Sequence, residues 1–159
     1  EGADIVRAGR HVTIAATSYM VIEALKSAEE LAKIGVEAEV IDLRCLTPID
    51  TLTLKSSLSK TGHLIVADTG QAAFGVAAEV IAQASQHAFQ YLKAAPCSIA
   101  LPHLPTPTTP ALADLFYPGA RDISEAVHAM LRASKPLPPI GTHTQQWRDT
   151  PDPSFTGPY

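Results

Sequence analysis

Aspartates and histidines are the residues of this chain that could act as metal ligands, acids or bases. The six histidines show none of the spacings typical of a metal site, such as HxH or HExxH. Asp42, Asp50 and Asp68 fall near the ends of strand-like segments, where carboxylates can carry out acid–base chemistry. Asp50 is better explained as a helix cap, and Asp42 and Asp68 as loop anchors. We therefore expect neither a metal site nor catalytic residues.

One segment between a strand and a helix could bind a small anion. Residues 69–75 lead into a helix N-terminus, where free backbone N–H groups favour negative charge. The segment is not GxGxxG, so a dinucleotide site is disfavoured. The candidate loop or interface residues are Asp68, Thr69, Gly70, Gln71, Phe74 and Gly75, together with His103 in a later loop.

The two cysteines predict little chemistry. Cys45 lies beside Arg44 at a strand end and could be an activated thiolate, but no base can be assigned to it. A small buried filler is the favoured interpretation of Cys45. Cys97 is the only other cysteine, so we expect no disulfide framework. The small number of cysteines fits a reducing compartment better than an oxidising one.

Strand-like and helical segments alternate along most of the chain, a pattern typical of a parallel α/β sheet. Ser18 is expected to cap the first helix and Asp50 the second, and an Asp122 capping box should open the last helix. A proline-rich loop is expected at residues 102–110. The expected strands are residues 4–7, 12–16, 36–43, 63–67 and 97–101, and the expected helices are 19–34, 51–60, 75–93 and 122–133.

Composition excludes several classes of protein. The length of 159 residues fits one domain, and 46% hydrophobic with 18% charged residues is an ordinary globular composition. A net charge of −4 argues against a nucleic-acid partner. The apolar runs are too short to span a bilayer, and no signal peptide opens the chain. Because residue 1 is Glu and not Met, we expect a piece of a longer protein.

The character of the chain changes at Ser134, so we divide it into residues 1–133 and a proline-rich tail, residues 134–159. The favoured interpretation of the tail is a mostly extended segment. Alternatively, Trp147, Phe155 and Tyr159 pin it across the domain or a partner subunit. These aromatics and the alanine-rich face of the 75–93 helix suggest a homodimeric contact.

Residues 11–82 resemble the C-terminal domain of the β subunit of thiamine-diphosphate-dependent 2-oxo acid dehydrogenases, the E1 components of the pyruvate and branched-chain multienzyme complexes. The most specific pieces are AEVIDLRCL (residues 38–46) followed by Pro48 and Asp50, then KTGHL (residues 60–64) and residues 75–79. Further matches are Ala95-Pro96, PTP (residues 105–107) and the closing helix. The resemblance covers about residues 2–133.

The resemblance implies a three-layer α/β/α fold with a five-stranded, mixed, mostly parallel sheet, known as the transketolase C-terminal-like domain. It implies an oxidoreductase in which thiamine diphosphate and Mg²⁺ are bound outside this domain. The implied partners are the E1 α subunit, a second E1 β subunit and the E2 subunit-binding domain. The domain would support assembly and E2 docking without being catalytic. The implied location is the bacterial cytoplasm, or the mitochondrial matrix in a eukaryote.

The chain departs from the family pattern at one pair of positions. Where the family often has an Arg after the Ala-Pro dipeptide and an Asp before the proline pair, this chain has Ile99 and His103. Two charges lost together suggest a lost ion pair. Asp68 could keep the acidic role that the family often places in its loop. These differences leave the acyl substrate and the E2 contacts open.

Two alternatives stay open. One is the equivalent domain of another thiamine enzyme, of the transketolase or deoxyxylulose-phosphate synthase type. The sequence IDLRCLTPID (residues 41–50), followed later by the proline-rich loop, favours the dehydrogenase. The other is a stand-alone flavodoxin-like module that binds a small anion at residues 69–75.

Overall fold

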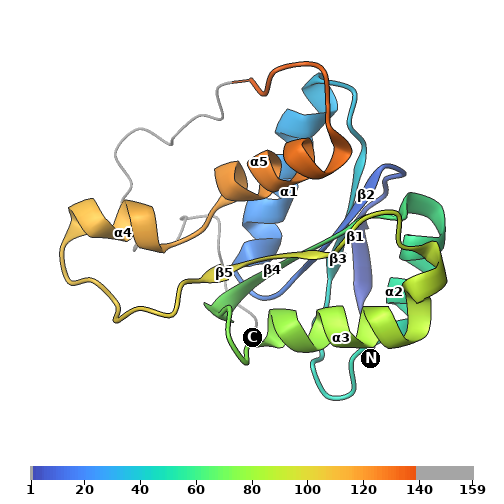
Figure 1. The fold of residues 1–159 in the computed structure, drawn as a ribbon, viewed down its shortest axis with the longest axis horizontal. Helices are drawn as coiled ribbons and strands as arrows, with labels where there is room; N and C mark the ends of the chain where they lie inside the picture. The colour runs from blue at the N-terminus through green and yellow to red at the C-terminus, as the bar shows by residue number, and fades with distance from the viewer. Residues whose placement is uncertain (1, 139–159) are drawn as a thin grey trace.

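A five-stranded sheet forms the centre of the molecule in the computed structural model, which describes residues 2–138 (Figure 1). The strand order is β1-β3-β2-β4-β5. β1 runs antiparallel to β3 and every other neighbouring pair is parallel, which confirms the mixed, mostly parallel sheet. The strands are β1 (Asp4–Arg7), β2 (Val12–Ala16), β3 (Ala38–Asp42), β4 (Leu64–Gln71) and β5 (Cys97–Leu101).

Helices cover both faces of the sheet and complete the three-layer α/β/α arrangement (Figure 1). One face carries α1 (Met20–Lys33) and α5 (Ala120–Leu131), and the other carries α2 (Thr51–Thr61) and α3 (Val76–Ala88). A 3₁₀ turn, η1 (Phe89–Tyr91), follows α3. The short helix α4 (Pro110–Phe116), which was not predicted, lies to one side. No helix in the described part of the chain has the length and apolar character to cross a membrane.

The central strand β2 is buried by helices on both faces of the sheet. Each of its five residues is buried, in the sequence VTIAA, and such continuous burial is typical of a parallel strand between two helical layers. Val12 and Ile14 pack beneath α1 and α5, whereas Ala15 packs towards α2 and α3. Thr13 is buried too, and its hydroxyl pairs with those of Ser57 (2.6 Å) and Thr61 (2.7 Å). These hydroxyl pairs fix α2 against the sheet.

The alanines of α3 pack inside the domain. Ala77, Ala84 and Ala88 are buried with Val80 against the sheet. This face was expected to touch a second copy, but the sheet already covers it, so it gives no support to a homodimeric contact. The tail aromatics Trp147, Phe155 and Tyr159 lie outside the described residues. The helix also ends earlier than expected, at Ala88.

Two predicted helix caps are wrong. The N-cap position of α1 is Tyr19, and Ser18 has a positive φ of 49° that excludes it from the capping role. Asp122 is the third residue of α5, where its Oδ2 accepts a hydrogen bond from the N–H of Gly119 (2.8 Å). The next N–H, that of Ala120, donates to Glu23 of α1 (2.8 Å), so this end of α5 is capped by a neighbouring helix.

The predicted cap at Asp50 is confirmed. Its Oδ1 accepts a hydrogen bond from the N–H of Thr53 (2.9 Å) at the start of α2. Its Oδ2 accepts from the N–H of Ala3 (3.1 Å), which ties the start of the chain to the same helix. These hydrogen bonds lower the pKa of Asp50 below its usual value.

Candidate functional site at the carboxyl edge of the sheet

The loops that follow β2, β3 and β4 lie together at the carboxyl edge of the sheet, the usual place for a binding site in this class of fold. Each of these loops holds a residue with positive φ that is not glycine: Ser18 (49°), Arg44 (52°) and Phe74 (59°). Such a conformation costs about 1 kcal/mol or more per residue. The edge therefore holds its loops in constrained conformations.

Asp68 is the one carboxylate of the candidate set that is buried, with 3% of its surface exposed. Its Oδ1 accepts a hydrogen bond from the hydroxyl of Thr17 (2.9 Å), and its Oδ2 accepts from the N–H of Ala77 (3.4 Å) in the first turn of α3. Asp68 therefore anchors the end of β4 to the β2 loop and to the helix, and both of its oxygens have a protein partner.

Thr17 is a partner that sequence reasoning did not single out. It directly follows Ala16, which pairs with Ala67 in the parallel register of β2 and β4. Thr17, directly after the end of β2, therefore lies opposite Asp68 of β4. The contact could have been predicted from the sequence once that register was assumed.

The segment from Thr69 to Gly75 contains less turn than predicted. Thr69, Gly70 and Gln71 belong to β4, which continues because Gln71 pairs with Leu101 of β5. The turn is confined to residues 72–75, with Gly75 at the N-cap position of α3.

The start of α3 does not form an anion site. The carboxylate of Asp68 already accepts from the N–H of Ala77, and a bound anion there would face a buried negative charge. The anion-binding alternative consequently loses its structural basis at this turn.

His103 and Gln71 meet at the same edge of the sheet. The Nδ1 atom of His103 lies 3.3 Å from Oε1 of Gln71, and both residues line a hollow of about 240 Å³ with Leu104 and Pro105. Phe74 is fully exposed close to the start of α3, and 62% of Leu104 is exposed. The edge therefore presents apolar side chains to its surroundings.

The described residues contain no group of three or more His, Cys, Asp or Glu side chains that could hold a metal ion. Cys45 was expected to be a buried filler, but it is only partly buried, and its thiol donates to the carbonyl of Thr47 (3.4 Å). Cys97 is also partly buried, and burial raises its pKa. The environment of Cys97 therefore disfavours its thiolate form.

Replacing Asp68 by asparagine is expected to destabilise the protein by about 1–2 kcal/mol, because the charged bonds to Thr17 and the α3 N-terminus are lost. Urea unfolding would measure the change. Asp4→Asn is the matched control, since Asp4 is exposed on the edge strand β1. Its free energy of unfolding should change by no more than about 0.5 kcal/mol. Equal losses in the two variants would contradict the anchoring role of Asp68.

Comparison with known proteins agrees with this geometry. The family described as Transketolase, C-terminal domain, matches residues 1–123. The β subunit of acetoin:2,6-dichlorophenolindophenol oxidoreductase from Cupriavidus necator is 41% identical over 84% of this chain and 39% of its own length. The β subunit of the pyruvate dehydrogenase E1 component from Chaetomium thermophilum is 38% identical over 82% of this chain and 34% of its own. In Bacillus subtilis the corresponding β subunit is 36% identical over 81% of this chain and 39% of its own.

A solved structure has the same fold. The chain named "Split gene transketolase, inactive beta4 tetramer" superposes with a TM-score of 0.72 and 27% identity, over 84% of this chain and 43% of that one. The present chain thus spans less than half the length of these relatives. Because the family matches most of the chain, and the fold and the relatives agree with it, this chain belongs to the transketolase C-terminal domain family.

Proposed function

We propose that this chain is the C-terminal domain of the β subunit of a thiamine-dependent E1 enzyme. The whole enzyme would oxidatively decarboxylate a 2-oxo acid and pass the acyl group to a lipoyl-E2. The observation that carries the proposal is the 36–39% identity to pyruvate dehydrogenase E1 β subunits, continuous over more than four fifths of this chain.

This domain contributes assembly surfaces and no catalytic residue. At the carboxyl edge the buried carboxylate of Asp68 is used to hold two loops and a helix. Thiamine diphosphate and its metal ion are placed in other parts of the enzyme, as the resemblance to E1 β subunits implies. An exposed aromatic ring held on a constrained turn, as at Phe74, is typical of a contact surface.

The partners proposed for these surfaces are the E1 α subunit, a second E1 β subunit and the subunit-binding domain of E2. The similar solved structure is named as a tetramer, which supports an oligomeric assembly. Bacterial and mitochondrial relatives both occur, so the cellular location follows the source: the bacterial cytoplasm or the mitochondrial matrix.

A second candidate function is oxidation of acetoin. It is favoured by one observation, the 41% identity over 133 residues to the acetoin oxidoreductase β subunit. Both candidates make the chain the same domain of the same kind of thiamine enzyme. They differ in the substrate of the whole enzyme.

Calorimetric titration of the chain with the subunit-binding domain of its E2 tests the proposal. We expect binding, weakened about tenfold or more by Phe74→Ser, because a buried aromatic at an interface contributes about 2 kcal/mol. Phe89→Ser is the control, since Phe89 is similarly exposed but lies after the other end of α3. Absence of binding, or equal losses in both variants, would refute the docking role. Turnover of pyruvate or acetoin by the chain alone would refute the non-catalytic role.

A further inference from the structure

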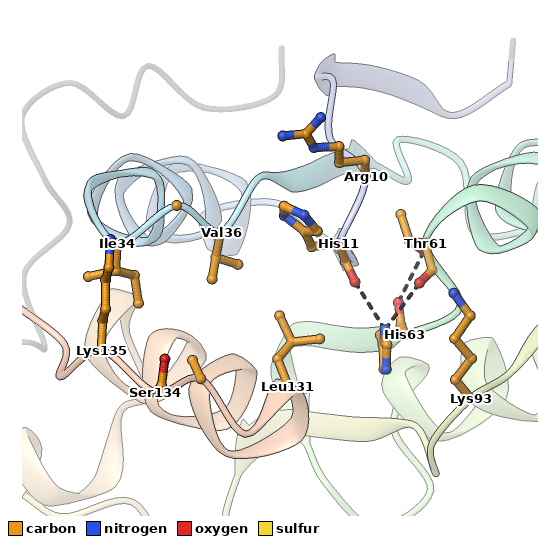
Figure 2. Close-up of a pocket in the computed structure, with 12 residues that line it drawn as sticks. Arg10, His11, Ile34, Val36, Thr61, His63, Lys93, Leu131, Ser134 and Lys135 are labelled. Carbon is orange, nitrogen blue, oxygen red and sulfur yellow. Dashed lines mark hydrogen bonds between the residues drawn. The ribbon is translucent and has the colours of Figure 1, made fainter.

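A pocket of about 400 Å³ opens at the amino edge of the sheet, opposite the edge described above (Figure 2). Its walls come from the segments that precede β2, β3, β4 and β5 and from the ends of α1 and α5. The volume lies within the range of about 300–1,000 Å³ that is usual for small-molecule sites. Sequence reasoning could not find it, because residues far apart in the chain build it.

Positive charge dominates the lining. Arg10, Lys93 and Lys135 carry full positive charges, two histidines accompany them, and none of the twelve lining residues is Asp or Glu. No ion pair holds these three cations within the described part of the chain. The C-terminal ends of α1, α2 and α5 face the same region, each with about half a negative charge. The three full positive charges exceed the partial negative charges of these three helix ends. The pocket is therefore locally positive, although the net charge of the chain is −4.

His63 is oriented so that one ring nitrogen is available to a ligand. Its Nδ1 lies 3.0 Å from the carbonyl oxygen of His11 and 3.1 Å from that of Thr61, so Nδ1 carries a proton and donates to both. The other nitrogen, Nε2, lies on the far side of the ring from these carbonyls (Figure 2). When the ring is protonated, Nε2 is a hydrogen-bond donor held in a fixed direction.

Lys93 is positioned beside His63 by its neighbour Gly62. Its backbone N–H donates to the carbonyl of Gly62 (2.8 Å), and its methylene groups cross directly over that glycine. A Cβ at position 62 would lie 2.6 Å from the Lys93 side chain. The backbone therefore leaves room for this lysine stem, and the ammonium group lies at the Thr61 end of the pocket (Figure 2).

Apolar side chains separate this basic wall from the opposite one. Val36 and Leu131 point between His63 and the side carrying Ser134 and Lys135 (Figure 2). Arg10 directs its guanidinium away from His63, so it adds charge at the rim and makes no contact with the centre of the pocket. A charged wall next to an apolar floor suits a small molecule with an anionic head and a carbon skeleton.

We propose that this pocket binds a small organic phosphate. The phosphate group lies against the ammonium group of Lys93, which supplies a charged donor, and against Nε2 of His63, and the carbon skeleton lies over Val36 and Leu131. Phosphate suits the site better than a single carboxylate because it carries more negative charge and its three terminal oxygens can accept from both donors at once. This binding site is independent of the proposed role in assembly.

Calorimetric titration of the 159-residue chain with α-glycerophosphate tests the proposal. We expect saturable binding that Lys93→Met and His63→Asn each weaken about tenfold, the effect of losing one charge-assisted hydrogen bond. Asparagine can keep the donation to the two carbonyls while removing Nε2. Lys55→Met is the control, because Lys55 is exposed on α2 and outside the pocket. It should change the affinity less than twofold.

Three results would overturn the proposal. The unchanged chain binds no α-glycerophosphate at millimolar concentration, in which case the basic groups only neutralise the helix C-termini. Lys55→Met weakens binding as much as Lys93→Met, which indicates non-specific attraction of anions. Inorganic phosphate, sulfate and glycerate bind as tightly as α-glycerophosphate, which excludes an organic phosphate site. Thermal unfolding of each variant shows whether it is folded.

Discussion

Replacing Gly9 by alanine is expected to destabilise the protein by about 3 kcal/mol or more. Gly9 crosses the start of β3 so closely that a Cβ would lie 2.1 Å from the backbone nitrogen of Glu39 and 2.3 Å from the carbonyl carbon of Ala38. Neither atom can move away, because β3 is held between β1 and β2. The added methyl group must therefore separate the strands or displace the connection between β1 and β2. Urea unfolding would measure the loss.

Gly35→Ala is the matched control for this prediction. Gly35 has a φ of +87°, and nothing lies within 4 Å of a Cβ built there. Only the left-handed conformation is penalised, at about 1 kcal/mol. If the two substitutions were equally costly, close approach of the backbone at Gly9 would not be the cause. A loss at Gly9 below that at Gly35 would contradict the prediction outright.

Local sequence patterns predicted three of the five strands and one helix cap well. The bounds expected for β1, β2 and β5 match the structure because short apolar runs there end at turn residues. The cap at Asp50 could be identified because an aspartate directly before a helix commonly accepts a hydrogen bond from the first backbone N–H groups of that helix. The caps at Ser18 and Asp122 were misjudged by one to three residues, because several polar residues stand near each helix start.

Long-range contacts were the part that the sequence could not predict. In the sheet β1 pairs with β3 and not with β2, the next strand in the sequence. This pairing could not be predicted from any local sequence pattern. The end of β4 looked like a turn because it holds a glycine, yet pairing with β5 extends the strand to Gln71. The pocket at the amino edge depends on His63 and Lys93, which meet only through tertiary packing.

Glu39 is a buried acidic residue that the sequence did not single out. It is the second residue of β3, with 1% of its side chain exposed. Its Oε2 accepts from the ammonium group of Lys60 (2.6 Å) and from the N–H of Gly9 (3.3 Å). Burial raises the pKa of Glu39, but the hydrogen bonds and charge of its partners, Lys60 first, outweigh it and lower the pKa below its usual value. The folded state therefore favours the charged carboxylate.

Glu39→Gln is expected to lower the free energy of unfolding at neutral pH by about 2–3 kcal/mol, because charge-assisted hydrogen bonds are lost while the packing is kept. Lys60→Met should cost less, about 1–2 kcal/mol, since nearly half of the Lys60 side chain is exposed and water screens the pair. A double-mutant cycle between the two would isolate the coupling. Additive losses would show that the pair itself contributes nothing.

The same carboxylate predicts a dependence on pH whose sign follows from the lowered pKa. Above the ordinary pKa of 4.5 the group is charged in both states, and its full contribution to stability is present. As the pH falls below that value, the unfolded chain takes up a proton before the folded protein does, and the contribution is lost through the folded pKa. The unchanged chain should therefore lose stability on acidification more steeply than Glu39→Gln, and urea unfolding from about pH 7 to about pH 3 would measure both. A difference between them that stayed constant over this range would show that the Glu39 pKa is not lowered by folding, whereas convergence at low pH would assign the loss to this one buried charge.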